Sequence, residues 1–184
     1  MPTQLFEPRK EVRTAPGKTT KPSLGVLRRL ERLLDTTAEL YRTACRLILG
    51  FVMLAHGSQK MFGWFGGSGF SGTVQGFREH LGIPTAMAVL VILAEFLGSL
   101  GLIFGLLGRV GAGCVIAVML GAIFLVHAPN GFFMNWSGKA PGEGFEYHLL
   151  AIGLALPVLI KGSGALSVDL ALVRRLRKDR TNAA

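Results

Sequence analysis

The sequence predicts an all-α membrane protein, a bundle of four transmembrane helices preceded by an amphipathic helix on the cytoplasmic side. Half of its 184 residues are hydrophobic and only 17% are charged, a low charged fraction for a soluble domain. The hydrophobic residues form long blocks, and most of the 20 Lys and Arg residues lie near the two ends. This length corresponds to one domain.

The first 40 residues divide into two segments. Residues 1–23 are rich in Pro, Thr and basic residues and lack an apolar period, so we predict a disordered basic leader. Over residues 24–40 leucines recur at helical spacing, while Arg28, Arg29 and Arg32 lie elsewhere around the helix. This pattern predicts an amphipathic helix in the cytoplasmic leaflet, with its arginines at the lipid headgroups. A helix that binds a partner protein, or is simply solvated, is the alternative.

Four apolar blocks follow, and we expect each to cross the membrane: 43–62, 85–107, 110–128 and 145–161. A bilayer core of about 30 Å requires roughly 20 helical residues. The second and third blocks meet this requirement easily. The first meets it although it carries His56 and Lys60. The fourth is short, because Glu146 and His148 stand at its start.

The distribution of basic residues predicts the orientation. Four spans put both termini on one side, and that side holds the basic ends of the chain, so we expect both termini in the cytoplasm of a bacterium and the protein in its inner membrane. Loops 63–84 and 129–144 then lie outside, with a short interfacial helix over 72–82, and residues 171–184 form a basic cytoplasmic tail. Anionic lipid headgroups account for the net charge of +9, so we expect no nucleic-acid partner.

Residue spacing predicts which helix faces point into the bundle. Steps of four and three, typical of a left-handed bundle seam, relate two sets of residues: Arg46, Gly50, Met53, Gly57 and Lys60, and Glu146, Leu150, Gly153, Pro157 and Ile160. The second set places His148 on the opposite side of its helix, toward the headgroups. Small residues on the two middle blocks predict a close helix contact: Ala94, Gly98, Gly101 and Gly105 against Gly113, Ala117 and Gly121.

Ionisable residues from all four spans converge on the outer half of the predicted bundle: His56, Lys60, Glu95, His127 and Glu146. Such groups are costly inside a membrane unless they are paired or hydrated. One interpretation is a structural ion pair, Lys60 with Glu95 or with Glu146, that fixes helix register. The other is a polar pocket for a small ligand.

Metal and cofactor motifs give no stronger hypothesis. His56 and His127 could in principle ligate a haem, but Lys60 beside His56 disfavours it. The sequence holds no CxxC, HExxH, phosphate-binding glycine loop or hydrolase serine elbow. We therefore expect no metal and no tightly bound cofactor, and no catalytic residue is identified.

Over residues 43–170 the chain resembles the DoxX family of small bacterial and archaeal membrane proteins. The resemblance rests on Arg46 to Phe65 with its HGSQK core, on GGSGFSGT, on Glu95 before Gly98, and on VHAPNGFFMNW, GFEYHLL and GSGALSVD. It implies four transmembrane helices. The family is named for a subunit associated with quinone-linked oxidation, including thiosulfate:quinone oxidoreductase, and has no agreed catalytic residues.

Two functions from different classes follow. In the first, the chain is a membrane subunit of a quinone-linked redox assembly, at most an oxidoreductase subunit, that binds quinone or a small sulfur compound in the polar pocket. His56 or Glu95 would then exchange protons with the ligand. In the second, it is a non-catalytic scaffold within a membrane complex. A transporter ranks lower, since the sequence shows no inverted repeat or broken helix. Lipids and other subunits are the expected partners.

Overall fold

The structure is a computed structural model that describes residues 25, 29, 34 and 39–182. The predicted leader over 1–23, and most of the predicted amphipathic helix over 24–40 with Arg28 and Arg32, lie outside the described residues. Arg29 is exposed and Leu34 is buried.

Over the described residues the chain is helical and contains no strand. Its α-helices are α2 Leu40–Phe62, α3 Gly69–Leu81, α4 Thr85–Phe104, α5 Gly108–Ala122, α6 Glu146–Lys161 and α7 Val168–Thr181. Three short turns complete the order: η1 Trp64–Gly66, the π-helical η2 Ile123–His127 that continues α5, and η3 Ala128–Asn130. The predicted interfacial helix over 72–82 corresponds to α3, which begins three residues earlier than expected.

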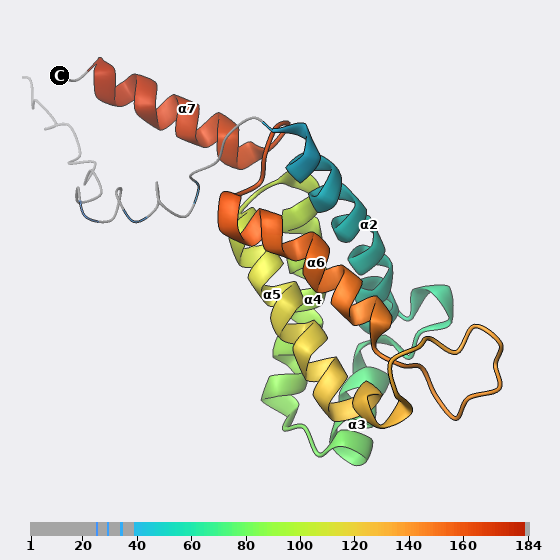
Figure 1. The fold of residues 1–184 in the computed structure, drawn as a ribbon. Helices are drawn as coiled ribbons and strands as arrows, with labels where there is room; N and C mark the ends of the chain where they lie inside the picture. Colours follow the sequence, from blue (N-terminus) through green and yellow to red (C-terminus); the bar gives the residue numbers. More distant parts are fainter. Residues whose placement is uncertain (1–24, 26–28, 30–33, 35–38, 183–184) are drawn as a thin grey trace, which may run out of the picture.

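Helices α2, α4, α5 and α6 form a closed four-helix ring, since α2 packs on α4, α4 on α5, α5 on α6 and α6 on α2. Figure 1 shows α7 at one end of this bundle, and α3 with the loop 131–145 at the other. We refer to these as the α7 end and the α3 end. The core contains nine buried side chains from the four helices: Leu49, Met53, Leu102, Ala112, Val115, Met119, Ala151, Ala155 and Val158.

The outer surface of the bundle is largely apolar. Large hydrophobic side chains from all four helices are exposed, among them Phe51, Leu97, Leu120 and Leu150, as expected of a surface that faces lipid. Two helical segments, Thr85–Phe104 and Gly108–Asn130, are long and apolar enough to cross a membrane. Helix α6 has only 16 residues, and α2 contains several charged residues. Length and composition alone therefore do not identify α2 and α6 as membrane spans.

Glycines allow the close helix contacts. A β-carbon at Gly50 would lie 2.9 Å from Cγ1 of Ile103, so α2 and α4 approach closely here. Between α4 and α5, a β-carbon at Gly111 would lie 2.8 Å from the carbonyl oxygen of Gly98. The predicted contact of these two helices is confirmed, but the predicted face of the second helix is wrong: Ala117 is exposed, and Gly121 has no neighbour within 4 Å in the described structure. After Arg109 in its first turn, helix α5 is apolar on every side, so small-residue spacing alone did not identify its packing face.

The predicted inward face of α6 is also wrong. Leu150 is 69% exposed and Ile160 is 62% exposed, whereas Ala151, Ala155 and His148 are buried. Most residues of α6 are apolar, so the spacing of its few polar residues carried little information. The bundle instead buries its small alanines, which allow closer packing against α5.

A network of buried hydrogen bonds closes the α7 end. Arg46 is fully buried, and its guanidinium donates to the carbonyls of Ser163 (3.0 Å), Ile103 (2.6 Å), Leu166 (3.1 Å) and Leu102. The segment 162–167 therefore crosses the ends of α2 and α4 before α7 begins. Sequence reasoning placed Arg46 on the inward seam, which is correct, but did not anticipate these partners.

Candidate functional site

The predicted ion pair between Lys60 and Glu95 is present at the α3 end of the bundle. Lys60 lies in the last turn of α2, and its Nζ is 2.8 Å from Oε1 of Glu95 on α4. The glycine one turn earlier explains this reach, because a β-carbon at Gly57 would lie 2.9 Å from the Cα of Phe96. Without a side chain at position 57, the helices lie close enough for Lys60 to meet a carboxylate that is only 1% exposed.

The second carboxylate oxygen of Glu95 is a further polar feature of the site. Oε2 is buried and has no hydrogen-bond partner among the described residues. Buried polar atoms in proteins are nearly always hydrogen-bonded. This oxygen can therefore accept a hydrogen bond from a group that enters the site.

A cavity of about 330 Å³ adjoins the ion pair, lined by Gln59, Lys60, Gly67, Ser68, Gly72, Thr73, Gly76 and Phe77. Gly72 and Gly76 are four residues apart on one face of α3, and their missing side chains leave this space open. A β-carbon at Gly67 would lie 2.3 Å from the carbonyl oxygen of Gln59, so the loop after α2 folds tightly back on its last turn. The volume lies near the lower end of the ~300–1,000 Å³ of ligand pockets, which suits a small molecule or a headgroup.

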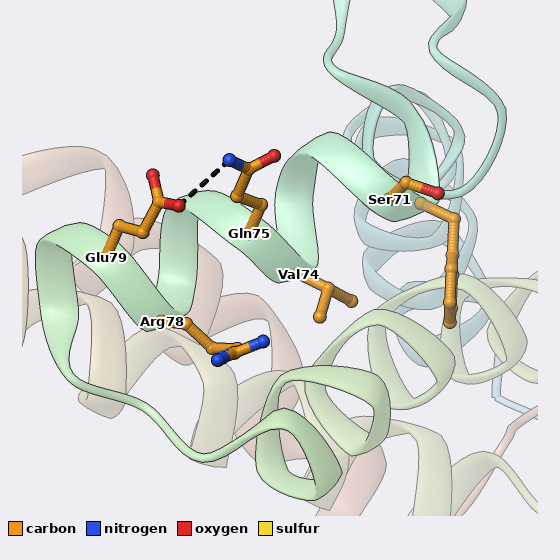
Figure 2. A pocket seen from close by; sticks show the side chains of 6 residues that line it. Ser71, Val74, Gln75, Arg78 and Glu79 are labelled. Atoms are coloured by element: carbon orange, nitrogen blue, oxygen red, sulfur yellow. Dashed lines mark hydrogen bonds between the residues drawn. The ribbon is translucent and has the colours of Figure 1, made fainter.

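Figure 2 shows a second, larger cavity, of about 430 Å³, along α3. Gln75 and Glu79 on its rim are joined by a hydrogen bond of 2.8 Å, and Arg78 is its one basic lining residue. None of the ionisable residues predicted for the site lines it. The candidate site is therefore the cavity at Lys60.

Aromatic and histidine rings form a row beside the ion pair. The ring centroids are 5.8 Å apart for His56 and Tyr147, 5.5 Å for Tyr147 and His148, and 4.2 Å for His148 and His127. His148 is only 6% exposed, so the expectation that it faces the headgroups is wrong. The cause is that α6 turns a different face into the bundle from the predicted one, as described above.

The remaining predicted residues lie at the edge of this row. His127 is half-buried, and its Nδ1 is 2.8 Å from the carbonyl oxygen of Glu143. Glu146 accepts a hydrogen bond of 3.4 Å from Nε1 of Trp136 and forms no ion pair with Lys60 in the described part of the chain. Of the five predicted residues, the structure places Lys60 and Glu95 in direct contact and His56 one helical turn before Lys60, whereas His127 and Glu146 contact the loop before α6.

Sequence reasoning missed two members of the row. Tyr147 was not predicted as part of the cluster, and His148 was expected at the headgroups, yet Tyr147 packs against the core and His148 is buried. The signal available was their position next to Glu146, where three polar residues in succession begin an apolar helix.

Comparison with known proteins shows to which family these residues belong. The DoxX family model matches residues 42–128, which include Lys60 and Glu95. The inner membrane protein YqjF of Escherichia coli (strain K12) is 36% identical over 107 residues, which cover 58% of this chain and 77% of that protein. The chain belongs to the DoxX family. Helix α6 and the 162–169 segment lie beyond the matched residues.

A second relative of this DoxX protein carries a functional name. It is the protein named "Putative oxidoreductase CatD" of Bacillus subtilis (strain 168), 27% identical over 136 residues, which cover 74% of this chain and 90% of that protein. No solved structure matches the chain. The family and the first of these relatives support a membrane protein of the bacterial inner membrane.

Proposed function

We propose that this DoxX protein is a membrane subunit of a quinone-linked redox assembly, and that the cavity at Lys60 binds the headgroup of a quinone or a small sulfur compound. The observation that carries the proposal is the combination of three features in one place. A cavity of about 330 Å³ is lined by Lys60, this lysine is paired with buried Glu95, and the second oxygen of that carboxylate has no partner among the described residues.

The chemistry of these groups suits such a ligand. The ammonium of Lys60 can donate a hydrogen bond to a quinone carbonyl, or attract the negative charge of a sulfur anion. Reduction of a quinone to a quinol takes up two electrons and two protons. Glu95 and His56 are the nearby groups that can exchange protons. The electrons would come from a redox-active partner subunit, so the chain alone is not a complete enzyme.

We propose that all four bundle helices cross the membrane, with the α7 end in the cytoplasm. The closed helix ring and the exposed apolar side chains on all four helices support this topology. Hydrogen bonds to the buried carbonyl groups would offset the desolvation free energy of the Arg46 guanidinium within α2. Basic residues of α7 would lie at the anionic headgroups of the inner leaflet.

Purification of the full chain from its native membrane in a mild detergent tests this function. We expect a lipid-soluble quinone to co-elute, detected by mass spectrometry, together with redox-active partner proteins. The control is the Lys60→Met variant purified in parallel, which should lose the quinone. Stable recovery of partner proteins with no quinone in either preparation would instead favour a non-catalytic scaffold, a function for which the close glycine contacts between helices also suffice.

A further inference from the structure

His148 is a buried ionisable side chain that the proposed ligand site does not use directly. Its ring interacts with the carbonyl of Phe145, but Nδ1 is buried and does not meet the geometry of a hydrogen bond with any described residue. An imidazole in such a position can take a proton on one ring nitrogen and release it from the other. Such a proton can be passed on only if neighbouring groups connect His148 with the cavity and with water.

The neighbours of His148 connect the cavity with the surface. On the inner side, the row runs from His148 through Tyr147 to His56, with ring centroids 5.5 Å and 5.8 Å apart. His56 lies one helical turn before Lys60, whose Nζ is 2.8 Å from Glu95. Rings at these centroid distances are in contact, so a small side-chain rotation or one bridging water molecule is enough to bring their polar atoms within hydrogen-bond reach of each other.

On the outer side, the row ends at His127. Its ring centroid is 4.2 Å from that of His148, and its Nδ1 is 2.8 Å from the carbonyl oxygen of Glu143 in an exposed loop. His127 closes the π-helical turn η2. Such turns are frequent at functional sites, because they displace a side chain from regular helical spacing.

From this geometry we infer that His148 and His127 transfer protons between the cavity at Lys60 and the aqueous phase at the α3 end. The inference rests on the proposed ligand site and specifies how that site exchanges protons. When a quinone in the cavity is reduced by two electrons from the partner subunit, it takes up two protons. Each proton enters at His127, passes through His148, Tyr147 and His56 to the carboxylate of Glu95, and is passed on to the ligand, so that Glu95 returns to its ionised state paired with Lys60. No electron moves along this row, and each residue returns to its starting protonation state.

Other charged groups near the row are consistent with proton transfer from the aqueous phase at His127 toward the cavity at Lys60. Lys60 and Glu95 at its inner end form a compensated pair. Glu146 at its outer end is half-buried and hydrogen-bonded to Trp136, so it can attract protons toward the entrance. Met53 accepts the hydroxyl of Tyr147 at 3.7 Å, a weak hydrogen bond that leaves this hydroxyl able to turn.

The test is a pH jump on the full chain in detergent, with the protonation of Glu95 followed by time-resolved infrared spectroscopy. The carboxyl band of Glu95 is assigned by its loss in Glu95→Gln. We expect His148→Phe, which keeps a ring but cannot carry a proton, to slow the response on the order of 10²-fold. His127→Ala should slow it as well, and imidazole added to the buffer should restore the rate. His80→Phe, the same change at an exposed position on α3, serves as the control and should respond at the wild-type rate.

Three outcomes would overturn the inference: a wild-type rate in His148→Phe, a slow His127→Ala response that imidazole does not restore, or no carboxyl response in the wild-type protein. If His148→Phe does not fold, the half-exposed His127→Ala variant decides. Binding of a short-chain quinone is titrated separately. Loss of quinone binding with an intact relay would count against the proposed function alone, and intact binding without a relay would count against this inference alone.

Discussion

The carboxylate of Asp169, in the first turn of α7, accepts a hydrogen bond of 2.6 Å from the hydroxyl of Ser163 in the segment that follows α6. The same carboxylate accepts the backbone N–H groups of Leu107 (2.8 Å) and Gly108 (3.0 Å) at the start of α5. Asp169 is 1% exposed. One buried side chain thus joins α7 to the turn between α4 and α5.

Asp169→Ala should destabilise the fold strongly. It removes three hydrogen bonds and leaves the N–H groups of Leu107 and Gly108 without their acceptor, at a cost of about 1–3 kcal/mol for a group that stays buried, as that of Gly108 does. Ser163→Ala removes one bond and should cost less. Thermal unfolding in detergent measures both, with Asp179→Ala, exposed on the same helix, as the control. Equal melting temperatures for Asp169→Ala and the control would show that this junction contributes nothing.

Gly57→Ala should separate α2 from α4 and weaken the Lys60–Glu95 pair. The added methyl group would lie 2.9 Å from the Cα of Phe96, a backbone atom that cannot move aside without shifting the helix. The matched control is Gly121→Ala. Among the described residues outside its own helix, no atom lies within 4 Å of a β-carbon at this position, so the change should be neutral or stabilise by up to about 1 kcal/mol. The two variants are compared by thermal unfolding. A Gly57→Ala variant as stable as the control would contradict the close packing of these helices.

Cysteine labelling of intact cells tests the proposed topology. In a background that lacks Cys45 and Cys114, single cysteines replace Ser68 and Ser137, both exposed at the α3 end. A membrane-impermeant maleimide should label these two positions from outside, because the basic ends of the chain favour the cytoplasm. A cysteine at Ser23 should be labelled only after the cells are opened. Labelling of position 23 in intact cells would reverse the orientation.

Hydropathy and charge spacing predicted much of the architecture, because a helix in lipid must be long, apolar and internally hydrogen-bonded. The bundle, α3 and the Lys60–Glu95 pair were all predicted from the sequence. The face that α6 turns into the bundle was not predicted, since a nearly uniform apolar helix has no polar face to mark its outer side. For the same reason His148 was predicted on the wrong side of this helix. The acceptors of Arg46 are backbone carbonyls, which no residue pattern reveals.

The Lys60→Met and Glu95→Gln variants, singly and combined, test the central claim that the ion pair is part of a ligand site. Lys60→Met leaves the buried carboxylate of Glu95 without its partner and should destabilise the protein by roughly 3–5 kcal/mol, whereas Glu95→Gln leaves a lysine that is 27% exposed and should cost less. The double variant should recover most of that loss.

The deciding measurement is quinone binding by the double variant, titrated at a temperature where it is as stable as the wild-type protein. We predict that binding is lost although folding is restored, because no ammonium and no ionised carboxylate remain at the cavity. A double variant with wild-type stability that still binds quinone with wild-type affinity would contradict the account and assign Lys60 and Glu95 to the architecture of the bundle alone.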